Sequence, residues 1–155
     1  MSGFSGVETL RKLYQRELAR LRNEIELYGT EEAIWKKGGD IPNSAGNLCL
    51  HLVGNLSTYI GADIGNSGYV RKRDLEFSST DISREDLLVK IDDTAAVVDA
   101  TLAGLTNEAL TEIYPQEVLG EPVETGYYLA HLVTHFAYHL GQINYHRRFF
   151  DATAS

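Results

Sequence analysis

The segment from residue 127 to residue 150 most constrains how this chain folds. Its apolar and aromatic residues recur three and four positions apart, which is the period of one face of an α-helix. The recurring positions are Tyr128, Leu132, His135/Phe136, His139 and Ile143. Four of the chain's five histidines lie in the same segment, at His131, His135, His139 and His146. The pattern predicts an amphipathic helix that carries several imidazoles.

Helix geometry limits which of these histidines can share one metal ion. Residues four apart lie one above another, about 6 Å along the axis, whereas residues eight apart are separated by about 12 Å. Because a metal–imidazole bond is only about 2.0–2.1 Å long, we do not expect His131 and His139 to share an ion. The pair is therefore His131/His135 or His135/His139. A third ligand has to come from another helix, and His51 is the candidate because it is the only histidine outside this segment.

Two stretches of the chain resemble the DinB/YfiT-like metalloenzyme superfamily. The run HFAYHLGQ, from His135 to Gln142, is similar to the His-x-x-x-His-x-Gly-Gln signature of the last helix in that superfamily. The run GNLCLHLVGNL, residues 46–56, resembles its second helix, and the resemblance extends over essentially the whole chain. It implies a four-helix bundle in which His51, His135 and His139 are the metal ligands. Many members carry Arg after the second histidine of the signature, where this chain has Leu140.

The resemblance also implies a function. Several relatives are similar to thiol S-transferases and isomerases, so the expectation is a metal-dependent enzyme that acts on a small molecule with a low-molecular-weight thiol as cosubstrate. The expected cofactor is one divalent transition metal, zinc or nickel, with iron or copper as alternatives. A homodimer is a further expectation from the family. Two other interpretations stay open: a non-enzymatic module with a structural or adventitious metal, and a metal-free core in which the histidines are hydrogen-bonded.

Length and charge exclude several other classes of protein. A chain of 155 residues is expected to form one domain, residues 1–155. The net charge of −8 argues against nucleic acid as a partner. No apolar run is long enough to span a membrane, and with no signal-peptide core the expected location is the cytoplasm. Cys49 is the only cysteine, which excludes an internal disulfide and a multi-cysteine metal site.

The remaining periodicity predicts an all-α fold. Helices are expected at residues 4–28, ending at Gly29, at residues 44–62 behind an Asn43 or Ser44 cap, and from a capping-box-like start at Ser83 to about residue 105. Residues 30–43 are expected to form a loop or a short helix, and residues 65–82 are expected to be loop. Pro115, Gly120 and Pro122 favour a short hairpin or irregular loop before the last helix. The expected architecture is a four-helix bundle with long connections.

Several single residues have competing interpretations. Trp35 is expected to pack on the core rather than to contact a substrate. Tyr59, Tyr138 and Tyr145 could donate protons, but core packing is the expected role of each. His131 is left unassigned between the core and the vicinity of the site.

Other polar residues are interpreted from their positions near the histidines. His146 is read as a favourable charge at the C-terminal end of its helix. Gln142, one turn beyond His139, could orient a ligand. Arg71, Arg73 and Glu76 could line the mouth of a pocket, but a surface ion pair is expected. Cys49 is about 200° around the helix from His51 and should not reach the same ion.

Overall fold

Helices form the whole regular structure of the described part of the chain. The computed structural model describes residues 3–151, in which it has no β-strand but two isolated β-bridges. The helices are α1 (Gly6–Leu27), α2 (Glu31–Ile34), α3 (Ala45–Leu56), the π-helix η1 (Ser57–Ala62), α4 (Arg73–Ser78), α5 (Arg84–Ala103), the 3-10 helix η2 (Glu108–Thr111) and α6 (Thr125–Phe150). The prediction of an all-α fold is confirmed.

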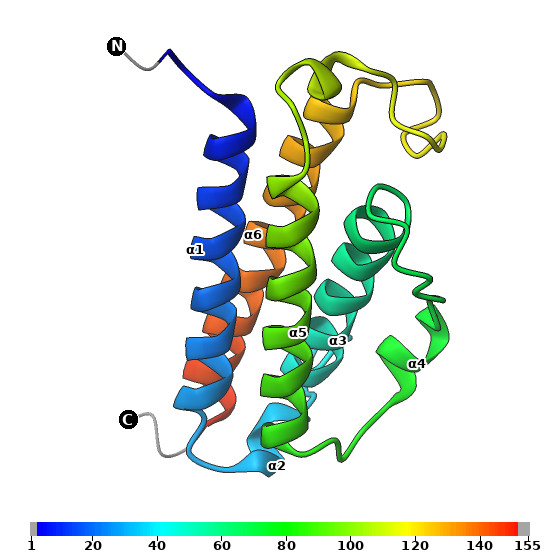
Figure 1. Ribbon diagram of the computed structural model, residues 1–155. Coiled ribbons are helices and arrows are strands. Elements are labelled where there is room, and N and C mark those ends of the chain that lie inside the picture. The colour runs from blue at the N-terminus through cyan, green and yellow to red at the C-terminus, as the bar shows by residue number, and fades with distance from the viewer. Residues whose placement is uncertain (1–2, 152–155) are drawn as a thin grey trace.

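Four long helical segments form a bundle. α1 packs against α5 and α6, and α3 packs against the same two helices, so α1 and α3 occupy opposite corners. α1 and α6 run in one direction along the bundle, and α3 and α5 run in the other (Figure 1). This order requires long connections, because the chain crosses from α1 to the opposite corner before α3 begins. The site described below lies where α3 and α6 face each other.

Serine caps set the starts of three of the long helices. The side-chain oxygens of Ser5, Ser44 and Ser83 accept hydrogen bonds from backbone N–H groups in the first turns of α1, α3 and α5. The predicted starts at Ser44 and Ser83 are therefore confirmed. Gly29 was predicted to cap the C-terminal end of α1, and this is wrong. The capping position is held by Tyr28, in an extended conformation. The Gly29 N–H instead donates to the Asp151 carboxylate at 2.7 Å.

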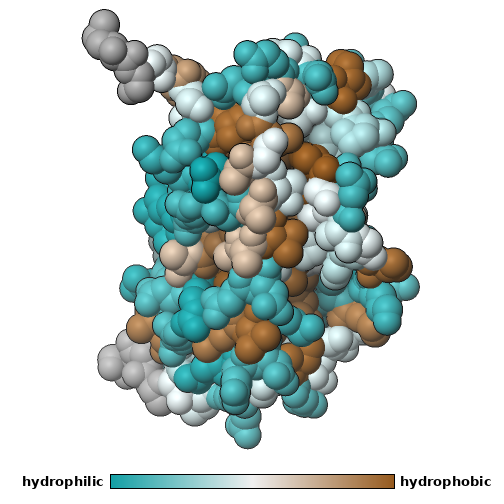
Figure 2. All heavy atoms as spheres, viewed as in Figure 1, coloured by the Kyte–Doolittle hydropathy of each residue, from teal (hydrophilic) through white to brown (hydrophobic). Residues whose placement is uncertain are grey.

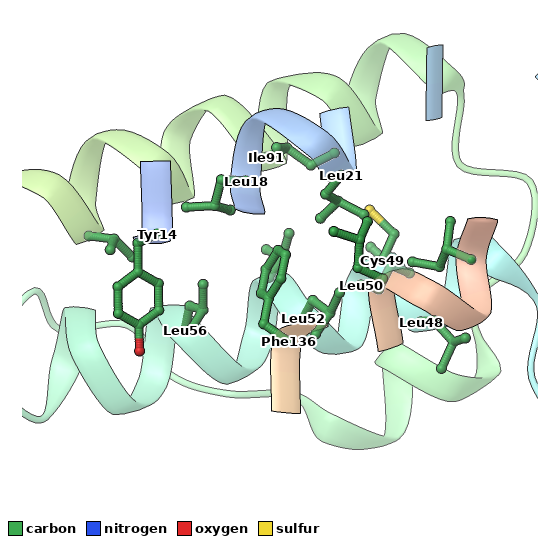
Figure 3. Packing of buried hydrophobic residues seen from close by; sticks show 14 of the residues in the cluster. Tyr14, Leu18, Leu21, Leu48, Cys49, Leu50, Leu52, Leu56, Ile91 and Phe136 are labelled. Atoms are coloured by element: carbon green, nitrogen blue, oxygen red, sulfur yellow. The ribbon is translucent and has the colours of Figure 1, made fainter. Parts of the chain in front are cut away.

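The core lies along the bundle axis and includes all four long helices. Phe136 of α6 is 1% exposed and lies among Leu21 of α1, Leu52 of α3 and Ile91 of α5 (Figure 3). Burying a side chain of this size stabilises the fold by about 1.5–3 kcal/mol. Phe136 directly follows His135, so the packing of the phenyl ring fixes the rotation of α6 and with it the direction of the neighbouring imidazole.

The connection from α3 to α5 departs from the predicted loop. The helical path continues beyond α3 as the π-helix η1 and ends near residue 62, as predicted. Residues 65–82 then contain the short helix α4, which sequence periodicity missed because six residues are too few for a recognisable pattern. α4 packs on α3, outside the four-helix bundle (Figure 1). This places its polar side chains against the face of α3 that carries His51.

The predicted hairpin before the last helix is reduced to a single β-bridge between Ile113 and Glu124. The Tyr114 N–H donates to the Val123 carbonyl at 2.9 Å beside it. On the face seen in Figure 2, apolar residues lie in separate patches among hydrophilic ones. No helix within residues 3–151 combines the length and apolar character that crossing a membrane requires.

Candidate metal centre

Three histidines from two helices converge between α3 and α6. His51 lies on α3, and His135 and His139 lie one turn apart on α6. Each offers a ring nitrogen, and these three nitrogens all lie within 4.8 Å of one another. The imidazole centroids are 5.1 Å apart for His51 and His135, 5.2 Å for His51 and His139, and 4.6 Å for the pair on α6. Of the two pairs that helix geometry allowed, the downstream one faces His51.

The spacing of the nitrogens fits one shared ion. His51 Nε2 and His135 Nε2 are 3.2 Å apart. Two imidazole nitrogens bound to one tetrahedral ion at about 2.0–2.1 Å are separated by about 3.3 Å. His135 Nδ1 is buried and has no hydrogen-bond partner within the described residues, so the local structure does not engage this ring in a competing role. The donor set of three imidazoles therefore fits a divalent transition metal.

Hydrogen bonds at Nδ1 orient two of the three rings. His51 Nδ1 lies 3.1 Å from Glu76 Oε1, and His139 Nδ1 lies 2.7 Å from Gln142 Oε1. An ionised carboxylate and an amide oxygen can only accept, so we assign the proton of each ring to Nδ1. The Nε2 lone pairs of His51 and His139 are then free to bind an ion. The role proposed for Gln142 from the sequence agrees with this contact.

Burial keeps the rings of His51 and His135 neutral. Desolvation, together with the neighbouring His139 and His51, lowers the pKa of His135 to about 4. Burial also lowers the pKa of His51, although the hydrogen bond with Glu76 opposes this change. Since only neutral imidazole binds a metal, both rings are in the binding form at pH 7.

Glu76 is the residue whose place the sequence did not predict. A surface ion pair with Arg71 was expected, and Arg71 does donate to both carboxylate oxygens, with Nε–Oε2 at 2.9 Å and Nη2–Oε1 at 3.0 Å. The pair is not on the surface, however, because Glu76 is 5% exposed and touches His51. The available signal was the sequence RKRDLEF, in which three basic residues precede two acidic ones, and this pattern gave no indication of which residue turns inward.

The other two histidines lie outside the cluster. His131 stacks on the ring of Tyr128, with centroids 5.8 Å apart. His146 was predicted to be a charge at a helix end, and that prediction is wrong. His146 is 4% exposed, and its two nitrogens lie 2.7 Å from the Tyr28 hydroxyl and 2.8 Å from the Lys36 carbonyl. Burial lowers its pKa, so it is a neutral core group.

The expectations for the tyrosines are only partly met. Tyr59 packs against the core as predicted. Tyr138 and Tyr145 do not, since they are 66% and 76% exposed on the outer side of α6. Each lies two residues after a buried residue of the apolar stripe, Phe136 or Ile143, and is therefore about 200° around the helix from the core.

Trp35 and Cys49 both belong to the core. Trp35 is half-buried and packs against it, as predicted, with its ring over Gly46. Cys49 is fully buried, and desolvation raises the pKa of its thiol to about 12. It is not a member of the histidine cluster, which agrees with its predicted direction.

A cavity of about 650 Å³ is lined by residues one turn away from the clustered histidines, although none of those three histidines lines it. Leu48, one turn before His51, and Gln142, one turn after His139, both line it. Ile41, Tyr145 and Phe149 give it largely apolar walls. A small organic molecule fits a space of this size.

Comparisons with known proteins agree with the helical fold. A crystal structure of a DinB-like protein from Bacillus cereus ATCC 10987 superimposes with a TM-score of 0.73, covering 91% of this chain and 90% of that one. The sequence identity is 15%, so the likeness establishes the shared fold. A comparison with curated proteins gave no match. The family described as "Protein of unknown function (DUF1572)" matches residues 5–154. The chain therefore belongs to the DUF1572 family and has the helical fold of DinB-like proteins.

Proposed function

We propose that this protein binds one divalent transition metal through His51, His135 and His139 and acts as a metal-dependent transferase on a small molecule, with a low-molecular-weight thiol as cosubstrate. The observation that carries the proposal is the convergence of three imidazoles, two of them oriented by partners on Nδ1. Three protein ligands leave a coordination position open, which is typical of catalytic rather than structural sites. Zinc and nickel are the preferred ions, with iron and copper as alternatives.

The surroundings favour a thiol over water as the nucleophile. An ion in this site would lower the pKa of a thiol bound to it, so that the thiolate is present at neutral pH. The carboxylate that touches the cluster, Glu76, is already held by Arg71 and His51 and is not free to act as a general base. Cys49 is buried elsewhere, so the thiol has to be supplied by a second molecule.

The position of the cluster supports access for such molecules. His135 and His139 are half-buried rather than enclosed. The neighbouring cavity has room for the apolar part of an acceptor, and Leu48 and Gln142 connect its wall to the turns that carry the histidines. The chain's contribution to the reaction is thus to hold the ion, to orient its ligands and to bind the acceptor beside them.

The experiment begins with metal analysis of untagged protein. The protein is then loaded with zinc or nickel and tested with glutathione or cysteine against aryl halide and epoxide acceptors. In the expected reaction the thiolate sulfur bonds to the acceptor carbon while halide leaves or the epoxide ring opens. We expect acceleration that disappears with a chelator and in His139→Ala.

Two outcomes would count against the proposal in different ways. Absence of stoichiometric metal in the wild type would reject the metal site and favour histidines that serve only the core. Bound metal with no acceleration, and with no change in the cobalt spectrum when thiols are added, would reject the transferase. That second result would favour a metal-binding protein without catalysis.

A further inference from the structure

Glu76 is a buried carboxylate that comes from outside the bundle. It lies on α4, is 5% exposed, and receives hydrogen bonds from Arg71 and His51. Burying a charge costs several kcal/mol, and even a well-paired buried ion pair seldom stabilises a fold more than apolar residues of similar size. A carboxylate in this position therefore calls for a role other than stability.

Attachment of α4 to the bundle does not explain the Glu76 side chain. The Asn47 side chain of α3 already donates to two backbone carbonyls of this segment, to Glu76 at 3.0 Å and to Ser79 at 2.8 Å. Asn47 is 1% exposed, and its own oxygen accepts from Ser44. These bonds fix the backbone of α4 without any contribution from the carboxylate, which is left to act on His51.

A recess in α3 admits the carboxylate. Gly54 lies one turn after His51, and a Cβ atom at this position would lie 2.0 Å from Glu76 Oε2 and 2.7 Å from its carboxyl carbon. Any residue other than glycine would therefore displace the carboxylate from His51. Gly54 gives the close approach that brings a side chain from α4 into contact with a ring on the bundle.

The contacts around His51 Nδ1 admit one assignment. Glu76 Oε1 is 3.1 Å away and can only accept a hydrogen bond, while Arg71 Nη2 is 3.4 Å away and can only donate one. Arg71 already uses both of its near nitrogens on the carboxylate. The proton of His51 therefore lies on Nδ1 and points at Glu76, and the lone pair of Nε2 points at His135. A negative partner on Nδ1–H also raises the basicity of Nε2 as a ligand.

We propose that Glu76 is the positioning residue of this site: held by Arg71 in the recess left by Gly54, it fixes the tautomer and orientation of His51 and thereby sets the affinity for the metal. This inference rests on the proposed metal site. It means that α4 contributes a residue to that site in addition to the histidines of α3 and α6. Phe77, whose ring centroid is 5.1 Å from that of His51, covers the same imidazole from the next position of α4.

The test compares Glu76→Gln with Glu24→Gln. Glu24 is the matched control, because it is a buried carboxylate paired with Arg147 and Asn144 and touches none of the three histidines. The first readout is affinity for Co²⁺, measured by competition with a chelator. We expect Glu76→Gln to weaken binding about 10- to 100-fold and to shift the visible absorption of the cobalt protein. Glu24→Gln should change affinity less than about twofold.

A second readout needs no metal. Nitrogen-15 NMR of the metal-free protein should show His51 with its proton on Nδ1. Glu76→Ala, which removes the acceptor, should lose that preference while Glu24→Ala keeps it. Gly54→Ala should reproduce the weaker metal binding of Glu76→Gln and the lost tautomer preference of Glu76→Ala. Gly46→Ala is its steric control, because a Cβ there would meet the Trp35 ring at 2.5 Å, away from the histidines.

The outcomes separate this inference from the proposed function. Wild-type protein that binds no metal rejects the metal site, and the NMR result then decides whether Glu76 orients His51. Wild-type protein that binds metal, together with unchanged affinity and spectrum in Glu76→Gln and an unchanged tautomer in Glu76→Ala, overturns the positioning role alone. Equal losses in Glu76→Gln and Glu24→Gln would also overturn it, since they would indicate general destabilisation.

Discussion

His135 and His146 lie on the same helix, about three turns apart, and burial lowers the pKa of both. The two rings differ in their hydrogen bonds, because within residues 3–151 both nitrogens of His146 have a polar partner outside the histidine cluster and those of His135 do not. The Lys36 carbonyl can only accept, so Nε2 of His146 carries its proton and Nδ1 accepts from the Tyr28 hydroxyl. His135 has no partner on Nδ1 within the described residues, and its Nε2 faces another imidazole nitrogen.

This difference separates a core histidine from a candidate ligand better than burial or spacing does. A buried ring with both nitrogens occupied has nothing left to offer an ion. A ring whose nitrogen faces those of two other histidines is held in an arrangement that an ion would stabilise. The two regions of α6 therefore predict opposite responses to the same substitution, one in metal binding and the other in stability.

The largest expected effect is on metal binding by the cluster. His135→Ala should lower the affinity for Zn²⁺ or Co²⁺ by more than about 100-fold, because it removes one of only three proposed protein ligands. Stoichiometry is measured by elemental analysis after dialysis. His146→Ala should keep one metal per chain. If His146→Ala loses the metal and His135→Ala keeps it, then His146 is the ligand and His135 is not.

Metal binding should also stabilise the fold. A ligand at 100 times its dissociation constant adds about 2.7 kcal/mol to the free energy of unfolding, which raises the melting temperature of a chain of this size by about 5–10 °C. Thermal unfolding with and without Zn²⁺ measures the change. His51→Ala is the control and should show no shift. An equal shift in this variant would place the ion elsewhere.

Substitution of the core histidine, His146, should lower the free energy of unfolding of the metal-free protein. His146→Ala leaves the Lys36 carbonyl and the Tyr28 hydroxyl without their ring partner, which should cost about 2 kcal/mol of unfolding free energy. Tyr28→Phe removes only one of these hydrogen bonds and should cost about 1 kcal/mol. Urea unfolding measures both. A cost below about 0.3 kcal/mol for His146→Ala would contradict its role in the core.

A smaller effect is expected in the pH dependence of stability. The pKa of His146 is lower in the folded protein than its ordinary value of about 6.5. The unfolded chain therefore takes up a proton first, and the stabilisation that is complete above about pH 6.5 decreases as the pH falls below it. Metal-free protein should lose stability from pH 7 to pH 5, and His146→Gln should lose it less steeply. Parallel curves would show that His146 does not contribute.

The smallest effect is expected at His131. Its ring stacks on Tyr128 and lies outside the cluster, so His131→Ala should change metal affinity less than about twofold. The same competition assay measures it. If His131→Ala loses the metal while His139→Ala keeps it, the upstream pair on α6 is the site.

The periodic patterns of apolar residues, together with the caps at Ser44 and Ser83, were sufficient to predict the four long helices and their approximate starts, because these depend on local hydrogen bonds and on the spacing of apolar residues. Helix pitch also limited the possible ligands to His51, His135 and either His131 or His139, because rings eight residues apart cannot meet on one ion. Spacing could not choose between the two pairs on α6, and only the family resemblance favoured the downstream pair. That choice depends on how α6 is rotated and where α3 meets it.

Tertiary structure alone decided the surroundings of each imidazole. From the sequence, His146 was interpreted as a charge at a helix end. Only its hydrogen bonds with Tyr28 and the Lys36 carbonyl, more than 100 residues earlier in the chain, make it a core group. Glu76 looked like part of a charged loop, and only the packing of α4 over Gly54 brings it to His51. Both contacts join residues far apart in the chain. A hydrogen bond between such distant residues produces no periodic pattern in the sequence, so it can be identified only from the packed structure.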